Sequence, residues 1–380
     1  MSDRSTYWRL SLFYYGYFSL LGGLVPYWAL YLQSLHFDPQ QIGLLMAILM
    51  GTRIVAPNLW GVLADRSGQR LRIIQLGSLA AWVVFAAAFW TSSFIGMALL
   101  MFAFTFFWNA VLPQFEVLTL QALGVARNRY SRVRLWGSIG FIVAVVGIGA
   151  LLERVGIQWL IGVLWALLGM ILLTSFSVAE QPDLPVEPTA ERLLTVLRRP
   201  EVITFFVVSL LVQLGHGPYY TFYSVFMTEQ GFTTTEIGLL WALGVVAEVL
   251  VFMVMHRLIE GLGLRRIVVW GLWLCALRWL MISQWPNLFW VVIPAQLLHA
   301  VTFGCLHAAS IALVYRFFPR HAQGQGQALY SSIGFGVGGA LGAFLSGVVW
   351  QQGGGELAFL MAALVSAIGG VLAWARLRVD

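Results

Sequence analysis

The chain has 380 residues, of which 60% are hydrophobic and 10% are charged, and its mean hydropathy is +0.83. Soluble domains carry about 25% charged residues, so an aqueous fold cannot hide this much apolar surface and the surrounding solvent must be lipid. The formal net charge is +6, and every basic residue is arginine. Membrane topology explains this excess and excludes nucleic acid as the partner that a basic chain would otherwise suggest.

Apolar segments of helical length follow one another along the chain. Runs of about 18–25 residues are typical of membrane helices, whereas barrel strands alternate over about ten residues. The first segment is too long for a cleavable signal peptide and lacks its A-x-A site. The sequence therefore predicts an all-α integral membrane protein with twelve spans, at 8–32, 41–63, 73–90, 94–119, 133–152, 157–178, 202–227, 235–256, 266–284, 287–314, 327–350 and 357–375.

Arginine is distributed unevenly among the connections. All arginines except Arg53, Arg154 and Arg278 lie at the termini or in the even-numbered connections. The positive-inside rule then predicts that both termini are cytoplasmic in a multi-pass protein of a bacterial-type inner membrane. The proline-rich polar stretch at 181–200 predicts a cytoplasmic linker between an N-terminal six-helix half, 1–180, and a C-terminal six-helix half, 201–380.

Short matches at nearly one offset indicate that the two halves are repeats. They are Pro-Tyr at 26 and 218, Ile-Gly-Leu-Leu at 42 and 237, and Ser-Ile-Gly-Phe at 138 and 332. Parallel repeats related by an axis along the membrane normal are typical of one large class of carriers. We therefore expect two pseudo-symmetric halves that rock about a central site.

The loop after the second span carries a recognisable motif. Residues 61–70 read G-V-L-A-D-R-S-G-Q-R and resemble the G-x-L-a-D-r-x-G-r-r loop of the major facilitator superfamily, departing only at Gln69. An arginine can bridge carboxylates, and a carboxylate is stabilised near a helix N-terminus. The alternative is an ordinary positive-inside turn. The residues expected to form a conformational latch are Gly61, Asp65, Arg66, Gly68 and Arg70.

Charged side chains inside apolar segments are costly in lipid, so they persist mainly beside a water-filled path, a partner or a ligand. Arg53 lies about 15 Å along its span, near mid-membrane, and the repeat offset relates it to Glu248 in the second half. Both residues are candidates for the transport site, with a structural ion pair as the alternative. Glu116 and Arg134 flank the loop after the fourth span, where they would contact substrate or form an inner-gate salt bridge.

The charged positions resemble the phenylpropionate-permease-like branch of the superfamily, which is related to lactose-permease-type proton symporters. The resemblance covers nearly the whole chain and rests on Arg53, residues 113–116, 133–138 and 244–248, Arg278 with Trp279, and His299 with His307. It implies that Glu116 and Arg134 help to hold substrate. It also implies that Glu248, Arg278 and His299 serve substrate binding and proton coupling.

One departure from the lactose type concerns the proton carrier. That type has a carboxylate just after its histidine in span 10, whereas Thr302 and Phe303 follow His299 here. Glu248 is the leading proton-carrying candidate, with His299 as its closest competitor. His307 is a further candidate, although eight residues turn a helix by 80° beyond two full turns and the two histidines need not share one face.

Aromatic residues and a helix break add candidates for substrate contact. Tyr14, Trp108 and Tyr219 lie in spans 1, 4 and 7, which line the cavity in the resembled fold; packing or lipid contact is the alternative for each. His216 lies in a Gly-His-Gly-Pro sequence that predicts a break in span 7. Broken helices often mark binding sites, but a packing kink would read the same way.

These observations predict a proton-coupled symporter of a small organic solute. The resemblance to the phenylpropionate-permease-like branch implies that the solute is an aromatic monocarboxylate such as 3-phenylpropionate. Arginine suits its carboxylate, and aromatic side chains suit its phenyl ring. A sugar or nucleoside that bonds the same carboxylates through hydroxyl groups is the alternative. We expect no cofactor except the coupling protons, no metal site, partners limited to the substrate and the bilayer, and a monomeric assembly.

Other functional classes fit the sequence less well. An enzyme is not expected, because the chain has no H-E-x-x-H or G-x-S-x-G motif and no cysteine–histidine cluster beyond two residues on one span. A channel would need an open pore. A non-transporting membrane sensor is the alternative from another class, and it would be expected to add a soluble output domain.

Overall fold

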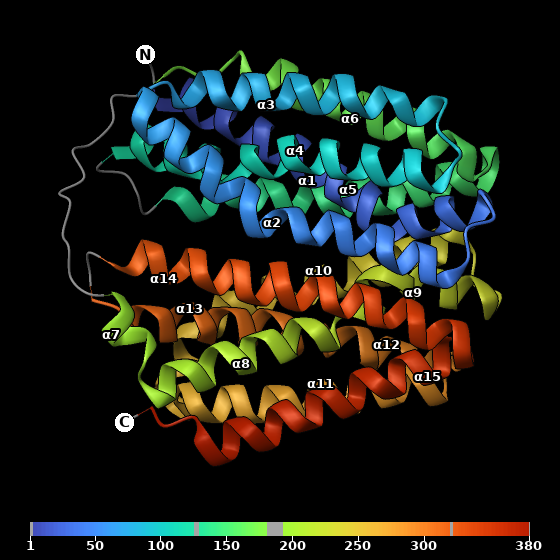
Figure 1. Ribbon diagram of the computed structural model, residues 1–380, viewed down its shortest axis with the longest axis vertical. Coiled ribbons are helices and arrows are strands. Elements are labelled where there is room, and N and C mark those ends of the chain that lie inside the picture. The colour runs from blue at the N-terminus through green and yellow to red at the C-terminus, as the bar shows by residue number, and fades with distance from the viewer. Residues whose placement is uncertain (1–2, 125–128, 181–192, 320–321, 380) are drawn as a thin grey trace. The chain divides into compact units, whose positions relative to one another are not determined.

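A computed structural model describes residues 3–124, 129–180, 193–319 and 322–379, and the regular structure within these ranges is helical (Figure 1). The α-helices are α1 (Asp3–Ser34), α2 (Pro39–Ser67), α3 (Arg70–Phe85), α4 (Phe94–Leu123), α5 (Tyr130–Val155), α6 (Leu160–Ser175), α7 (Leu193–Leu197), α8 (Pro200–Gly215), α9 (Gly217–Glu229), α10 (Thr234–Leu262), α11 (Leu264–Gln284), α12 (Phe289–Leu297), α13 (Leu306–Phe317), α14 (Gln323–Tyr330) and α15 (Gly339–Arg376). Two π-helical segments, η4 (Ala300–Cys305) and η6 (Ser331–Gly338), connect α12 to α13 and α14 to α15.

Ten helical stretches in the described residues are long and apolar enough to cross a membrane. One of them, 323–376, is interrupted where Gly353 and Gly354 leave helical geometry, so it provides two spans. The φ angle of Gly354 is +69°, which glycine adopts without a Cβ clash. Helix α1, with 32 residues, supplies the remaining span. The described helices therefore agree with the predicted all-α membrane fold of twelve spans.

Contacts between helices divide the chain into two compact units. The first unit comprises Met1–Phe37, Thr52–Glu187 and Thr233–Leu239, and the second comprises Asp38–Gly51, Pro188–Phe232 and Leu240–Asp380. In the first, α1 packs against α5 and α6, and α3 against α4; in the second, α8, α9 and α11 pack against α15. Most of the expected linker, residues 181–192, lies outside the described residues, so the boundaries at 180 and 201 stay a prediction.

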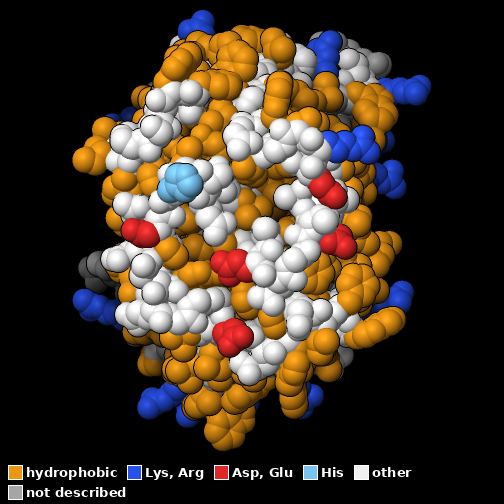
Figure 2. Space-filling model, turned by 90° about the vertical axis from the view of Figure 1, so that its right-hand side faces the viewer, with side chains coloured by type: hydrophobic (Ala, Val, Ile, Leu, Met, Phe, Trp, Pro, Cys, Tyr) orange, Lys and Arg blue, Asp and Glu red, His pale blue; other side chains and the backbone are white. Residues whose placement is uncertain are grey.

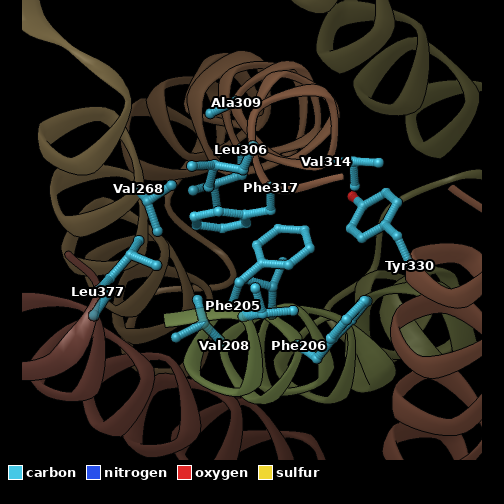
Figure 3. Close-up of a cluster of buried hydrophobic side chains, with 14 of the residues drawn as sticks. Phe205, Phe206, Val208, Val268, Leu306, Ala309, Val314, Phe317, Tyr330 and Leu377 are labelled. Carbon is cyan, nitrogen blue, oxygen red and sulfur yellow. The ribbon is translucent and has the colours of Figure 1, made fainter. Parts of the chain in front are cut away.

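Buried hydrophobic side chains hold the helices of the second unit together (Figure 3). The ring of Phe205 on α8 lies 5.9 Å from the ring centroids of both Phe317 and Tyr330. Lipid tails are as apolar as these side chains, so close packing stabilises the contact more than the hydrophobic effect does. Tyr330 lies at the edge of this cluster beside Val314 in Figure 3. Its hydroxyl group contacts His307.

Figure 2 looks onto the helix ends at the right-hand side of Figure 1, where acidic side chains and histidine lie among hydrophobic side chains and arginine lies at the margin. Exposed tryptophans are part of the surface, including Trp90 and Trp290, which are 82% and 85% exposed. Tryptophan is enriched at membrane–water interfaces, where one end of its ring system is apolar and the other is wet.

The predicted break in span 7 is present. Helix α8 ends at Gly215 and α9 begins at Gly217, so His216 connects the two. The Nδ1 atom of His216 lies 2.7 Å from the carbonyl oxygen of Val212. Since a carbonyl oxygen only accepts, Nδ1 carries the proton and Nε2 presents its lone pair to the interior of the unit.

Candidate functional site

In the first unit, the side chain of Arg134 on α5 lies against aromatic rings of α1. Its Cζ atom is 3.9 Å from the ring centroid of Phe18 and 5.7 Å from that of Tyr14. Gly137, nearly one turn further along α5, allows this approach, since a Cβ there would lie 2.7 Å from Phe18 and 2.8 Å from Nη1 of Arg134. Among the described residues, Arg134 makes no hydrogen bond and no close ion pair. The edges of its guanidinium group are therefore available to another partner.

Glu116 on α4 lies in the same region of the first unit. The hydroxyl of Tyr130 donates to Oε1 of Glu116 over 3.5 Å, and the charge of Arg134 acts on the same carboxyl group. The predicted neighbourhood of Glu116 and Arg134 is therefore present, but no close ion pair joins them within the described part of the chain.

Aromatic side chains line this region next to the charges. Trp108 on α4 stacks on Tyr17 with 5.2 Å between centroids, and both rings are buried. The charge of Arg53 on α2 acts on the hydroxyl of Tyr17, as do those of Glu116 and Arg134. Nε1 of Trp108 has no hydrogen-bond partner among the described residues. The first unit thus brings together an arginine with open edges, a second arginine, a carboxylate and flat aromatic surfaces.

In the second unit, Arg278 on α11 is fully buried and its donors are occupied by protein atoms. Nε donates to the carbonyl oxygen of Ala295 over 2.8 Å, and Nη2 donates to Oε1 of Gln296 over 3.3 Å. Nη1 contacts Oγ1 of Thr302 and Nδ1 of His299, each at 3.1 Å. Arginine has donors only, so Nδ1 of His299 must accept and the neutral ring carries its proton on Nε2.

The other nitrogen of His299 faces a carboxylate. Nε2 of His299 lies 3.6 Å from Oε2 of Glu248 on α10. In the same cluster, the Cζ atom of Arg278 lies 4.3 Å from the ring centroid of Tyr219, whose hydroxyl donates to Oε1 of Gln296 over 3.0 Å. Four of the predicted residues, from spans 7 to 10, therefore form one cluster, in which His299 stands between Glu248 and Arg278.

His307 takes part in a different set of contacts. Its Nδ1 atom lies 3.1 Å from the hydroxyl of Tyr330 on α14. The ring of Phe303 lies between His307 and His299 and is nearly parallel to both. The ring of Phe303 therefore separates the contact between His307 and Tyr330 from the ring of His299.

Comparison with known proteins assigns the whole chain to a family. A family model described as the MFS_1 like family matches residues 7–361. The chain belongs to the MFS_1-like family. The resemblance to the major facilitator superfamily is thus confirmed, and the protein is a multi-pass membrane transporter, not an enzyme.

Relatives of this MFS_1-like transporter are named for different substrates. A probable 3-phenylpropionic acid transporter of Escherichia coli is 28% identical over 376 residues, covering 94% of this chain and 95% of the relative. A maltose permease of Geobacillus stearothermophilus is 26% identical, with 94% and 92% covered. Among solved structures, a mutant of the nucleoside transporter NupG superposes with a TM-score of 0.86 at 16% identity, covering 98% of this chain and 100% of that one. At this identity the structure shows the fold alone.

The loop of the MFS_1-like transporter after α2 makes polar contacts within the first unit, while its role as a latch stays a prediction. Nη2 of Arg70 donates to Oδ1 of Asp65 over 2.6 Å, and Nη1 donates to Oε1 of Gln114 on α4. Gly68 ends α2 with φ at +62°, a conformation that favours glycine. Gly61 lies beside the same contact, since a Cβ there would be 3.6 Å from Nε2 of Gln114. The side chain of Arg66 is exposed.

Several residues that complete these sites are uncharged and were missed from the sequence. Gln296 and Thr302 share the donors of Arg278, and Phe18 covers the face of Arg134. Gln296 and Gln114 are polar residues within apolar segments, a signal that the cost of burying polar groups in lipid makes informative. Phe18 carries no such signal, because the chain contains 26 phenylalanines.

Proposed function

We propose that this transporter is a proton-coupled symporter of an aromatic monocarboxylate. The observation that carries the substrate class is the contrast between the two arginines. Arg278 is satisfied by four protein groups, whereas Arg134 has aromatic rings at its face and makes no hydrogen bond to a described residue. A guanidinium fork matches the two oxygens of a carboxylate, which would be held bidentately at Arg134.

The aromatic surroundings of Arg134 support a phenyl ring on the same substrate. Tyr14, Tyr17 and Trp108 are buried near the charges, and offset or edge-to-face contacts between rings contribute about 0.5–1.5 kcal/mol each. One relative is named a probable 3-phenylpropionic acid transporter, and this acid has both a phenyl ring and a carboxylate. We therefore propose 3-phenylpropionate, or an acid of similar size, as the substrate.

The second unit supports the proton-coupling part of the proposal. While Arg278 donates to Nδ1 of His299, this ring cannot take a second proton there, and its Nε2 proton points toward Glu248. The carboxylate of Glu248 is then the group that accepts the transported proton. A change of partner for Glu248 during the transport cycle would release it.

Uptake into liposomes containing the purified protein tests both parts. With an inward proton gradient, labelled 3-phenylpropionate should accumulate, and collapse of the gradient with a protonophore should abolish accumulation. Unlabelled 3-phenylpropionate should compete, whereas 3-phenylpropionamide, which has the ring but no carboxylate, should not.

The remaining outcomes separate substrate class from coupling. If maltose or a nucleoside accumulates in place of the aromatic acid, the carboxylate proposal is wrong and the coupling proposal stands. If 3-phenylpropionate only equilibrates across the membrane with the gradient imposed, the substrate class stands and proton coupling is wrong.

A further inference from the structure

Phe303 lies among three histidines of the second unit. Its ring centroid is 5.3 Å from that of His299 with 5° between planes, and 5.9 Å from that of His307 with 6° between planes. The ring of His216 lies 6.3 Å away, edge-on. The π-helical turn of η4 explains how residues eight apart share one face, since its wider turn takes up the angular offset that a regular α-helix would give.

The two sides of Phe303 differ in chemistry. On one side, His299 joins Glu248 to Arg278. On the other side, His307 contacts the hydroxyl of Tyr330. Phe303 is therefore an apolar ring between two polar groups of side chains that can each hold or pass a proton.

A small cavity adjoins this ring, and His307 and Thr302 both contribute to its lining. Its volume is about 10 Å³, which is the space of about one water molecule. The polar side chains in its lining are Ser209, Gln213, Thr302, His307, Ser310 and Tyr330. Gln213 is 5% exposed and makes no hydrogen bond to a described residue. The hydroxyls of Ser209 and Ser310 donate to carbonyl groups of their own helices, so their oxygens can still accept.

We propose that this cavity is a water site on a potential proton leak, and that the ring of Phe303 is the barrier that closes the leak. The inference rests on the proton coupling proposed above. A symporter remains coupled only if a proton cannot pass without substrate, and a water beside His307 would offer such a proton a route through the interior of the unit. The phenyl ring has no donor or acceptor, and its stacked position leaves no space for water between the two imidazoles. The titratable groups that face this ring are His216, Tyr220, His299 and His307.

Proton leak in the absence of substrate is the measurement that tests the barrier. Protein is reconstituted in liposomes with a trapped pH dye, a potassium diffusion potential is imposed with valinomycin, and internal acidification is followed. The Phe303→Ala variant should acidify the liposomes several-fold faster than the wild type. The Phe303→Leu variant keeps apolar bulk at the position and should remain as tight as the wild type.

Phe335 provides a matched control within the same neighbourhood. Its ring lies 6.3 Å from that of Phe303 and 5.9 Å from that of His307, but it does not stand between the two imidazoles. Phe335→Ala should therefore leave the leak at the wild-type rate. In the double variant Phe303→Ala with His307→Gln, the leak should fall back toward the wild-type rate, because the acceptor beyond the barrier is removed.

Substrate exchange and thermal melting in detergent establish that each variant is folded. If Phe303→Ala does not fold, Phe303→Val, which opens a smaller space, gives the same comparison. A folded Ala or Val variant that is as tight as the wild type overturns the barrier. An equal leak in Phe335→Ala, or a leak that persists without His307, overturns it as well. Failure of the wild type to accumulate substrate would refute proton coupling instead, and the leak assay would still report on Phe303.

Discussion

At the scale of single residues, two arginines inside the apolar segments serve different ends. Arg278 is enclosed by acceptors from α12 and η4, and removing one partner of such a buried charge is expected to cost several kcal/mol. Arg134 rests on aromatic rings, and its contact with Phe18 has the geometry of a cation–π interaction. Their charge and their position in apolar segments do not distinguish the two arginines; their contacts do.

Replacing Arg134 with lysine should weaken substrate binding about tenfold or more, or about 1.4 kcal/mol. An ammonium group keeps the charge but cannot form two parallel hydrogen bonds to a carboxylate. Calorimetric titration with 3-phenylpropionate measures the effect. Arg132→Lys, at an exposed position near the start of the same helix, is the matched control and should bind like the wild type. Unchanged affinity in Arg134→Lys would move the carboxylate partner to Arg53.

Replacing Glu248 with glutamine should abolish uphill accumulation while sparing exchange of internal for external substrate. An amide cannot take up the proton, and exchange needs no net proton movement. Paired assays of gradient-driven uptake and counterflow separate these steps. Glu260→Gln, an exposed change on the same helix, should affect neither. Accumulation by Glu248→Gln would show that the proton travels elsewhere, and loss of exchange as well would make Glu248 a substrate or packing residue.

At the scale of the helices, small residues decide which side chains can meet. Gly137 lets α5 place Arg134 over Phe18, and the π-helical turn of η4 places two histidines on one side of Phe303. Both are properties of the helix backbone, so substitutions there test the sites without altering a functional group.

Gly137→Ala should weaken substrate binding, because the new Cβ would lie under 3.0 Å from both Phe18 and Arg134 and must displace one of them. Gly147→Ala on the same helix is the control. Its Cβ would meet nothing within 4 Å, so binding should be unchanged and stability should rise by up to about 1 kcal/mol. Binding titrations and thermal melts of the two variants provide the comparison. Equal affinities would show that the position of Arg134 does not limit binding.

Asp65→Asn should slow transport while leaving the amount of protein in the membrane unchanged. The carboxylate of Asp65 is exposed, so loss of its pair with Arg70 should cost at most about 1 kcal/mol of stability. Arg70 would keep its bond to Gln114 but lose its charged partner. Initial uptake rates, normalised to protein in the membrane, measure the effect. A wild-type rate would indicate that the loop is only a topological turn.

At the scale of the whole molecule, the distribution of arginine predicts orientation. Single cysteines introduced into a background in which Cys275 and Cys305 are replaced by serine should report it in intact cells. A membrane-impermeant maleimide should label Gln158→Cys, in the connection after α5, and should not label Gln69→Cys, in the loop after α2. Both positions are exposed, so accessibility of the side chain itself does not distinguish them. The reverse pattern of labelling would place the termini outside.

The sequence alone was enough to predict the membrane helices, the fold and the family. Hydrophobic length is a local property that the bilayer selects for directly, and the loop at 61–70 is a contiguous motif. The break at His216 was predictable for the same reason, since glycine and proline beside it act on the local backbone. The candidate charged residues were also found from sequence, because charge within an apolar segment is conspicuous.

Only the tertiary structure decided how these residues are partnered. Whether Arg278 meets Glu248 directly or through His299 depends on the rotation of α10, α11 and α12 about their axes, which the apolar pattern of a lipid-embedded helix does not determine. The same holds for Phe18 beneath Arg134 and for Phe303 between two histidines. Helices in a bilayer are positioned by close packing and a few hydrogen bonds between distant segments, and these contacts exist only once the chain is folded.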